Sequence, residues 1–268
     1  MSTLPEYFRG KHVLVTGAST GIGLSASRLI VANGGSVTLI ARGADKLAAA
    51  ASTLGDRAHI LALDVTNSPE VREKLAAHLA RHPADMLINN AGAARPGRFV
   101  ELEDRHFHEM MDLNYFGTVH LCRAVVPHLI ARNGGHILNV ASMLGVLGIY
   151  GYSAYAASKF AVVGFSQCLR AELWPHGVKV SVCLPPNTDT PGLIEENRTK
   201  PRETHAIEGK VKTMSADAVA EAMLQGMASG TYEIVPGFDG WSTTLAARLL
   251  PGVTRLVCDS AQKKAGTL

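Results

Sequence analysis

The chain has 268 residues, of which 47% are hydrophobic and 18% are charged, a composition typical of one soluble α/β domain. Its net charge of +3 and the lack of basic clusters with interleaved aromatics argue against nucleic-acid binding. The four cysteines and eleven histidines form no CxxC or HExxH pattern, so we expect reduced thiols and no metal site. We find neither a signal peptide nor an apolar run of about 18 residues, which favours a cytoplasmic protein without a membrane span.

A glycine-rich turn follows the first predicted strand. Residues 11–16 form an apolar run, residues 17–23 read Gly-Ala-Ser-Thr-Gly-Ile-Gly, and residues 24–33 suit a helix. In this context the backbone approaches a pyrophosphate closely, and the N–H groups and dipole of the helix stabilise its charge. The pattern therefore predicts a dinucleotide site that includes Gly17, Ser19, Thr20, Gly21, Ile22 and Gly23.

The end of the second predicted strand, residues 36–41, indicates which dinucleotide binds. A carboxylate at this position would bind the adenosine ribose of NAD, but the chain has Arg42. An arginine there pairs with a 2′-phosphate through its planar fork, and Lys46 is a weaker candidate for the same phosphate. An ordinary solvated loop residue is the alternative for Arg42. We expect NADPH or NADP+ as the cofactor.

Strands and helices alternate along most of the chain. Predicted strands lie at 59–65, 85–90, 135–141, 179–184 and 232–236, with helices at 45–54, 71–81, 102–128, 154–174 and 216–229. This alternation predicts a single-domain, doubly wound parallel sheet of the Rossmann type over residues 11–240, followed by a C-terminal extension, 241–268. Ligands then bind beyond the carboxyl ends of the strands. We expect cofactor contacts there from Asp64, Val65, Asn90, Ala91 and Gly92.

A tyrosine and a lysine are candidates for acid-base chemistry. Tyr155 and Lys159 are four residues apart in a helix-favouring run, which places both side chains on one face. A phenol titrates near ~10, and a nearby ammonium favours the phenolate and lowers that pKa. Such a group can give a proton to a developing alkoxide. Ser142, at the end of strand 135–141, is placed to address the same substrate oxygen; a solvated helix face is the alternative for the Tyr-Lys pair alone.

In one order along nearly the whole chain, these elements resemble the short-chain dehydrogenase/reductase family. The matching elements are residues 16–23, Asp64, residues 89–92, Asn114, Ser142 and residues 155–159. The resemblance implies an acid-base role for Tyr155 and polarisation of the substrate oxygen by Ser142. It also implies ribose binding and a lowered Tyr pKa through Lys159, a relay water held by Asn114, and a homodimer or homotetramer.

The chain departs from this family at one position near the expected nicotinamide. The usual Pro-Gly after the sixth strand is Pro185-Pro186 here, and a proline cannot donate an N–H. Thr188 and Thr190 remain available to contact the carboxamide or the phosphates. The long polar segment that follows, residues 186–212, is expected to form a substrate lid.

Residues 188–192, 195–201 and 148–155 carry a narrower resemblance, to the 3-ketodihydrosphingosine reductases. It implies NADPH-dependent reduction of a hydrophobic long-chain amino ketone in sphingolipid synthesis, and from position alone Glu195 or Glu196 is a hypothetical partner for the substrate ammonium. Another hydrophobic ketone, such as a steroid or a 3-oxoacyl compound, stays open as substrate, and so does a non-catalytic NADP-binding regulatory protein. The basic, Leu-rich C-terminal end leaves peripheral membrane contact open.

Overall fold

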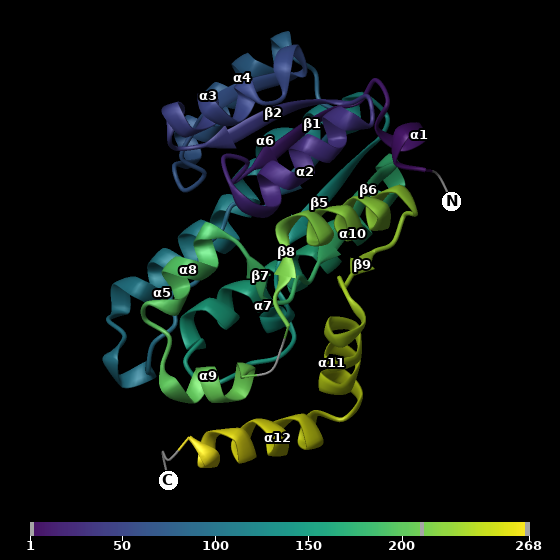
Figure 1. Cartoon of the computed structure of the whole chain (residues 1–268). Coiled ribbons are helices and arrows are strands. Elements are labelled where there is room, and N and C mark those ends of the chain that lie inside the picture. The colour runs from purple at the N-terminus through teal and green to yellow at the C-terminus, as the bar shows by residue number, and fades with distance from the viewer. Residues whose placement is uncertain (1–2, 210–211, 266–268) are drawn as a thin grey trace.

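The computed structural model describes residues 3–209 and 212–265. A parallel sheet forms the centre of the fold (Figure 1). Its seven strands lie in the order β3-β2-β1-β4-β5-β6-β9, and every neighbouring pair is parallel. The order reverses between β1 and β4, so the prediction of a doubly wound Rossmann-type sheet is confirmed. The strands are β1 His12–Thr16, β2 Ser36–Ala41, β3 Ala58–Ala62, β4 Met86–Asn89, β5 Gly135–Val140, β6 Val178–Cys183 and β9 Glu233–Ile234.

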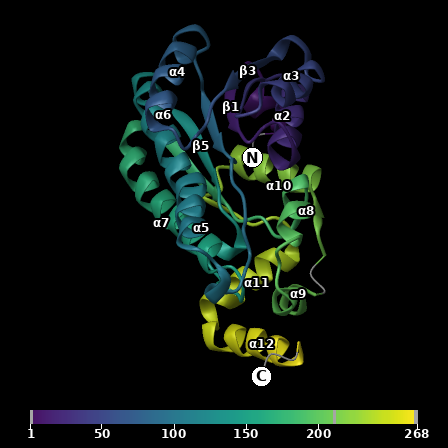
Figure 2. The same ribbon diagram turned by 90° about the vertical axis from the view of Figure 1, so that its left-hand side faces the viewer.

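Helices cover both faces of this sheet (Figure 2). One face carries α2 Gly21–Ala32, α3 Ala44–Ser52 and α10 Ala216–Ala228, with the short α1 Leu4–Phe8 beside α10; the other carries α4 Ser68–Arg81, α6 Gly117–Ala131 and α7 Ser153–Leu173. An apolar core fills each interface. Central strands such as β1 and β4 are buried along their whole length, which explains their unbroken apolar sequence. Short 3₁₀ turns follow some of these elements, at Gly55–Arg57, Phe99–Glu101, Met143–Gly145 and Trp174–His176.

The region predicted as helical, residues 102–128, is interrupted around Asn114. It consists of α5 Asp104–Met110, a π-helical segment η3 Met111–Phe116, and α6. A π-helical turn widens the helix locally and is frequent at functional sites. Pro127 does not end the helix, because α6 continues through it to Ala131.

The polar segment after β6 folds into small elements rather than an open loop. These are β7 Thr188–Asp189, α8 Pro191–Asn197, α9 Arg202–Glu208 and β8 Met214–Ser215, and β7 pairs with β8 in a second, two-stranded sheet. Two residues of the predicted lid 186–212, at 210 and 211, lie outside the described residues. Tyr152, which directly precedes α7, forms hydrogen bonds with Glu196 of α8 and Glu208 of α9, so both short helices contact the start of α7.

Two helices follow the last strand, α11 Phe238–Leu249 and α12 Pro251–Lys264. The first begins three residues before the predicted extension, 241–268. The second extends away from the sheet and contacts α9 (Figure 1). Residues 266–268 of the predicted extension lie outside the described residues.

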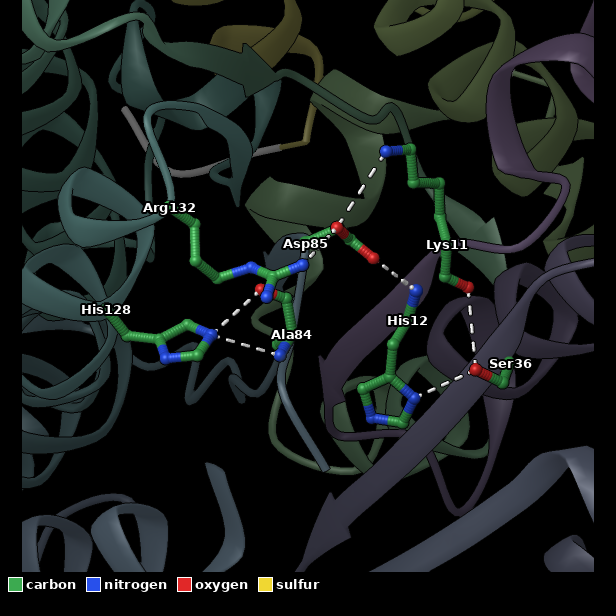
Figure 3. Close-up of polar contacts among 7 residues, drawn as sticks. All are labelled: Lys11, His12, Ser36, Ala84, Asp85, His128 and Arg132. Atoms are coloured by element: carbon green, nitrogen blue, oxygen red, sulfur yellow. Dashed lines mark hydrogen bonds and ion pairs between the residues drawn. The ribbon is translucent and has the colours of Figure 1, made fainter. Parts of the chain in front are cut away.

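Polar contacts join the amino ends of the strands at the edge opposite the glycine-rich turn (Figure 3). The Asp85 carboxylate accepts hydrogen bonds from the His12 backbone N–H at 2.9 Å and the Arg132 guanidinium at 3.2 Å, and lies 3.8 Å from the Lys11 ammonium. The His128 ring reaches the backbone of Ala84. These contacts link β1, β4 and α6 at the amino edge of the sheet. Ligands of doubly wound sheets bind at the opposite, carboxyl edge, where the candidate site lies.

Candidate active site

The glycine-rich turn after β1 has a backbone conformation and close contacts that leave no room for side chains at Gly17 and Gly23. Gly17 and Gly21 have positive φ angles of 63° and 56°. A Cβ at Gly17 would lie 2.9 Å from Asn90 Nδ2, and one at Gly23 would lie 2.5 Å from the Gly17 carbonyl oxygen. Thr20 precedes α2 without a side-chain capping bond, so the first N–H groups of this twelve-residue helix remain available. The turn therefore fits an anionic group.

The end of β4 is tied to this turn by hydrogen bonds. Thr16 Oγ1 accepts the N–H groups of Asn90 and Ala91, each at 2.9 Å, and Asn90 Nδ2 donates to the Thr16 carbonyl oxygen at 3.0 Å. Asp64 accepts two bonds from Thr66, at 3.0 and 2.8 Å, and Val65 is buried. The predicted cofactor residues of β1, β3 and β4 thus lie along one edge of the sheet.

Two cations follow the second strand, close to the turn. Thr16 pairs with Ile40 in the β1–β2 register, and the Gly17 N–H donates to the Ile40 carbonyl oxygen at 2.9 Å. Arg42, two residues further, therefore comes beside the glycine-rich turn. Its side chain and that of Lys46 are exposed. This placement suits a phosphate on the adenosine ribose.

Helix α7 brings Lys159 into the centre of the site. Its side chain is 4% exposed, and its Nζ donates to the Val140 carbonyl oxygen at 3.0 Å. The Nζ lies 5.7 Å from the centroid of the Tyr155 ring. A Cβ at Gly92 would lie 3.3 Å from this Nζ and 2.8 Å from Asn114 Oδ1. Burial lowers the pKa of Lys159 to about 8, so the amine is still mostly charged at neutral pH.

Ser142 and Tyr155 lie together, as the sequence predicts. Ser142 directly precedes the 3₁₀ turn Met143–Gly145, and its Oγ accepts the Leu144 N–H at 3.1 Å. Burial raises the pKa of Tyr155, a hydrogen bond with Ser142 opposes this, and the Glu196 charge raises the pKa further. This direction differs from the sequence prediction. Burial outweighs Lys159, whose ammonium is directed at the Val140 carbonyl.

Asn114 fixes the loop after β4 against the catalytic helix. Its Oδ1 accepts the Ala93 N–H at 3.0 Å, and its Nδ2 donates to the Ala93 carbonyl at 3.0 Å and to Ser158 Oγ at 2.9 Å. Ser158 in turn donates to the Tyr155 carbonyl at 2.7 Å. The Asn114 side chain is thus committed to protein partners, and its local π-helical backbone places it there.

The loop after β6 contacts both halves of the site. The Pro185 carbonyl accepts the Met143 N–H at 3.1 Å, which ties the double proline to the turn after Ser142. Thr188 Oγ1 donates to the Pro186 carbonyl at 2.8 Å. Thr190 caps α8, and a Cβ on Gly21 would lie 3.0 Å from its Cγ2. Helix α8 therefore begins against the glycine-rich turn.

A group of charged residues beside Tyr155 was largely missed from the sequence. Lys200 Nζ lies 3.1 Å from Glu196 Oε1 and 2.7 Å from Glu208 Oε2, and the Tyr152 hydroxyl donates to both carboxylates. Positional reasoning singled out Glu196 but gave no sign of Lys200, Glu208 or Tyr152. The two Tyr152 contacts join residues 44 and 56 positions apart, so only the folded arrangement of α8 and α9 brings them together.

Comparison with known protein families identifies the family to which the chain belongs. The sequence profile described as short chain dehydrogenase matches residues 11–201. The chain belongs to the short-chain dehydrogenase/reductase family. It is therefore an oxidoreductase, and the alternative of a non-catalytic binding protein loses its support.

Individual relatives cover most of the chain. A 3-ketodihydrosphingosine reductase of Dictyostelium discoideum is 38% identical over 92% of this chain and 79% of its own length. The 3-ketodihydrosphingosine reductase of Mus musculus is 37% identical over 90% and 75%. A short chain dehydrogenase from Burkholderia cenocepacia, solved in complex with NADP, is 28% identical with a TM-score of 0.77, covering 92% of this chain and 96% of its own.

Proposed function

We propose that this chain reduces 3-ketodihydrosphingosine to dihydrosphingosine with NADPH, a step of sphingolipid biosynthesis. The observation that carries the proposal is the similarity to reductases named for this ketone. At 37–38% identity it spans about nine tenths of the chain. The site itself supports ketone reduction, because a serine and a tyrosine lie together at the carboxyl edge of the sheet.

The residues at the turn fit NADPH. Glycine backbone and the open start of α2 suit the pyrophosphate, the exposed Arg42 suits the 2′-phosphate, and a related dehydrogenase was solved with NADP. When bound, the cofactor supplies the hydride. The residues proposed to hold it are Gly17, Ser19, Thr20, Gly21, Ile22, Gly23, Arg42, Lys46, Asp64, Val65, Asn90, Ala91, Gly92, Tyr155, Lys159, Pro185, Thr188 and Thr190.

Tyr155 is the proposed proton donor to the substrate oxygen. Its raised pKa keeps the phenol protonated at neutral pH, so the group holds the proton that a developing alkoxide needs. Ser142 Oγ accepts the Leu144 N–H, and its own O–H, which bonds Tyr155 in this structure, can donate to the same substrate oxygen. Two donors then stabilise the charge that develops there.

Lys159 and Asn114 support this pair. One N–H of the Lys159 ammonium is held by the Val140 carbonyl, and the others remain for a ribose hydroxyl and for electrostatic stabilisation of a Tyr155 phenolate after proton transfer. Asn114 holds the loop at Ala93 and the helix at Ser158 in register. Asn114 is therefore a positioning residue in this proposal. We also keep for it the role implied by the family resemblance, which is to hold a water that relays protons.

The direct test is cofactor oxidation with 3-ketodihydrosphingosine in mixed micelles, with NADPH and NADH compared and the product identified by mass spectrometry. Dihydrosphingosine formed with NADPH in preference to NADH supports the proposal. Turnover of steroid or 3-oxoacyl ketones alone would retain the reductase chemistry and discard the sphingoid substrate.

We also propose a homodimer or homotetramer built through α5, η3, α6 and α7. Phe116 on η3 and Phe160 on α7 are 43% and 46% exposed, which is unusual for aromatic side chains on an outer helical layer. Sedimentation velocity of the wild-type chain and of Phe160→Glu tests this interface. A monomeric wild type would contradict it.

Peripheral membrane contact through residues 241–268 is a further part of the proposal, with a cytoplasmic location. Trp241, Leu249 and Leu256 are more than half exposed on α11 and α12, and Arg255 and Lys263 lie nearby in sequence. Within residues 3–209 and 212–265, no helix combines the length and apolarity needed to cross a bilayer. Cosedimentation with anionic vesicles, compared with Leu256→Asp, tests the contact.

A further inference from the structure

Helices α8 and α9 place a cluster of charges against the catalytic helix. The cluster consists of Tyr152, Glu196, Lys200 and Glu208. The Lys200 side chain is 1% exposed and lies between the two carboxylates, whose side chains are 16% and 15% exposed. The Tyr152 side chain is almost fully buried and donates its hydroxyl hydrogen bond to this pair. The cluster is therefore part of the folded interior and not a solvated helix face.

This cluster carries more negative than positive charge. Two carboxylates share one ammonium, and Tyr152 contributes a hydrogen bond but no charge. Both contacts of Glu196, to Tyr152 and to Lys200, use Oε1, so the described residues leave its Oε2 without a hydrogen bond. An excess charge in a largely buried position is costly unless a cation completes it. The cluster is consequently built to accept one more cation.

The cluster lies next to the proposed proton donor. Tyr152 and Tyr155 are three residues apart, and their ring centroids are 5.7 Å apart. Glu196 is near enough for its charge to act on the Tyr155 phenol. A cation bound at Glu196 would therefore lie close to Tyr155.

The proposed substrate carries a cation at this place. In an α-amino ketone the ammonium is attached to the carbon next to the carbonyl carbon, so it is fixed close to the reacting oxygen. We propose that Glu196, with Glu208 sharing its charge, binds the substrate ammonium and thereby selects α-ammonium ketones over neutral ketones. This inference rests on the proposed function and assigns its specificity to named residues.

The neighbouring carboxylate does not have these properties. Glu195 is 69% exposed and forms an ion pair with Arg198, three residues along the same helix. A surface pair of this kind contributes little. The sequence hypothesis that allowed either residue is thus narrowed to Glu196, and Glu195 becomes a matched control on the same helix.

The test compares two ketones of equal chain length, 3-ketodihydrosphingosine and its counterpart without the amino group. We expect Glu196→Gln to lower the ratio of their kcat/KM values by roughly 10- to 100-fold, the scale of a lost charge pair in a desolvated site. Glu195→Gln should leave that ratio as in the wild type. Glu208→Gln, which removes the excess charge without altering Glu196, should lower the ratio as well, and it decides the matter if Glu196→Gln does not fold.

The outcomes distinguish a failure of the ammonium site from a failure of the proposed function. Wild-type activity on the amino ketone with an unchanged ratio in Glu196→Gln and Glu208→Gln would overturn the ammonium site and leave the proposed function standing. An equal loss on both ketones would assign the cluster a structural role and overturn the inference in the same way. A wild-type chain with no activity on the amino ketone would overturn both. Thermal unfolding of each variant provides the check on folding.

Discussion

Two buried histidines make the stability of this fold sensitive to acid. Thr38 Oγ1 lies 2.8 Å from His12 Nε2 and 2.7 Å from His78 Nε2, so one hydroxyl joins both rings. His12 is 8% exposed and His78 is 4% exposed. Burial, together with the nearby rings of His59 and His82, lowers the pKa of each to about 4. Both imidazoles are therefore neutral in the folded protein at pH 7.

The sign and size of the effect follow from these values. The unfolded chain binds a proton on each histidine below its ordinary pKa of about 6.5, while the native state resists protonation until about pH 4. Stability is therefore complete above about pH 6.5 and is lost as the pH falls toward 4. Each such histidine removes about 1.4 kcal/mol per pH unit, or roughly 3 kcal/mol in all. Two of them together remove a large part of the roughly 5–15 kcal/mol that stabilises a typical domain.

Urea unfolding at several pH values between 7.5 and 5 measures this effect. His78→Gln should be less stable than the wild type at pH 7.5, because a buried hydrogen bond is lost, yet its stability should fall more slowly with acid. The difference in slope should approach the ~1.4 kcal/mol per pH unit of one proton. His176→Gln, at an exposed position, is the control and should keep the wild-type slope. Equal slopes in wild type and His78→Gln would refute the reasoning.

Three further predictions concern the site. Tyr155→Phe should lower kcat by roughly 10²- to 10⁴-fold with little change in NADPH affinity, and unchanged turnover would remove its acid role. Gly92→Ala should lower kcat/KM by about 10-fold or more, because its Cβ would lie 2.8 Å from Asn114 Oδ1; Gly148→Ala, with nothing within 4 Å, is the control and should behave as the wild type. Arg42→Ala should raise the KM for NADPH by about 10-fold while the KM for NADH stays constant, and an equal change for both would contradict a 2′-phosphate contact.

Local patterns in the sequence predict the cofactor half well. The strand ending at Thr16, the glycine-rich turn and α2 are adjacent in the chain, so residue order alone specifies them. The observed strand order confirms the predicted parallel sheet. The prediction was possible because short apolar runs alternate with helical segments along the chain. Strand and helix limits differ from the predictions by a few residues, as expected where helix ends are set by capping and packing.

Features that depend on distant contacts could not be predicted. The π-helical turn at Asn114 arises where that side chain bonds both Ala93 and Ser158, and neither contact has a local signature. The direction of the Tyr155 pKa depends on how deeply the folded chain buries the ring. The bonds from Glu208 to Lys200 and Tyr152 exist only because α9 folds back onto the catalytic helix.

The measurement that tests the central claim most directly is the specificity of the purified chain among ketones with NADPH as reductant. Values of kcat/KM are compared for 3-ketodihydrosphingosine, a steroid ketone and a 3-oxoacyl compound, with Tyr155→Phe as the inactive control. The account predicts the highest value for the sphingoid ketone and dihydrosphingosine as the product. A higher value for either neutral ketone, with little or no dihydrosphingosine formed, would contradict it.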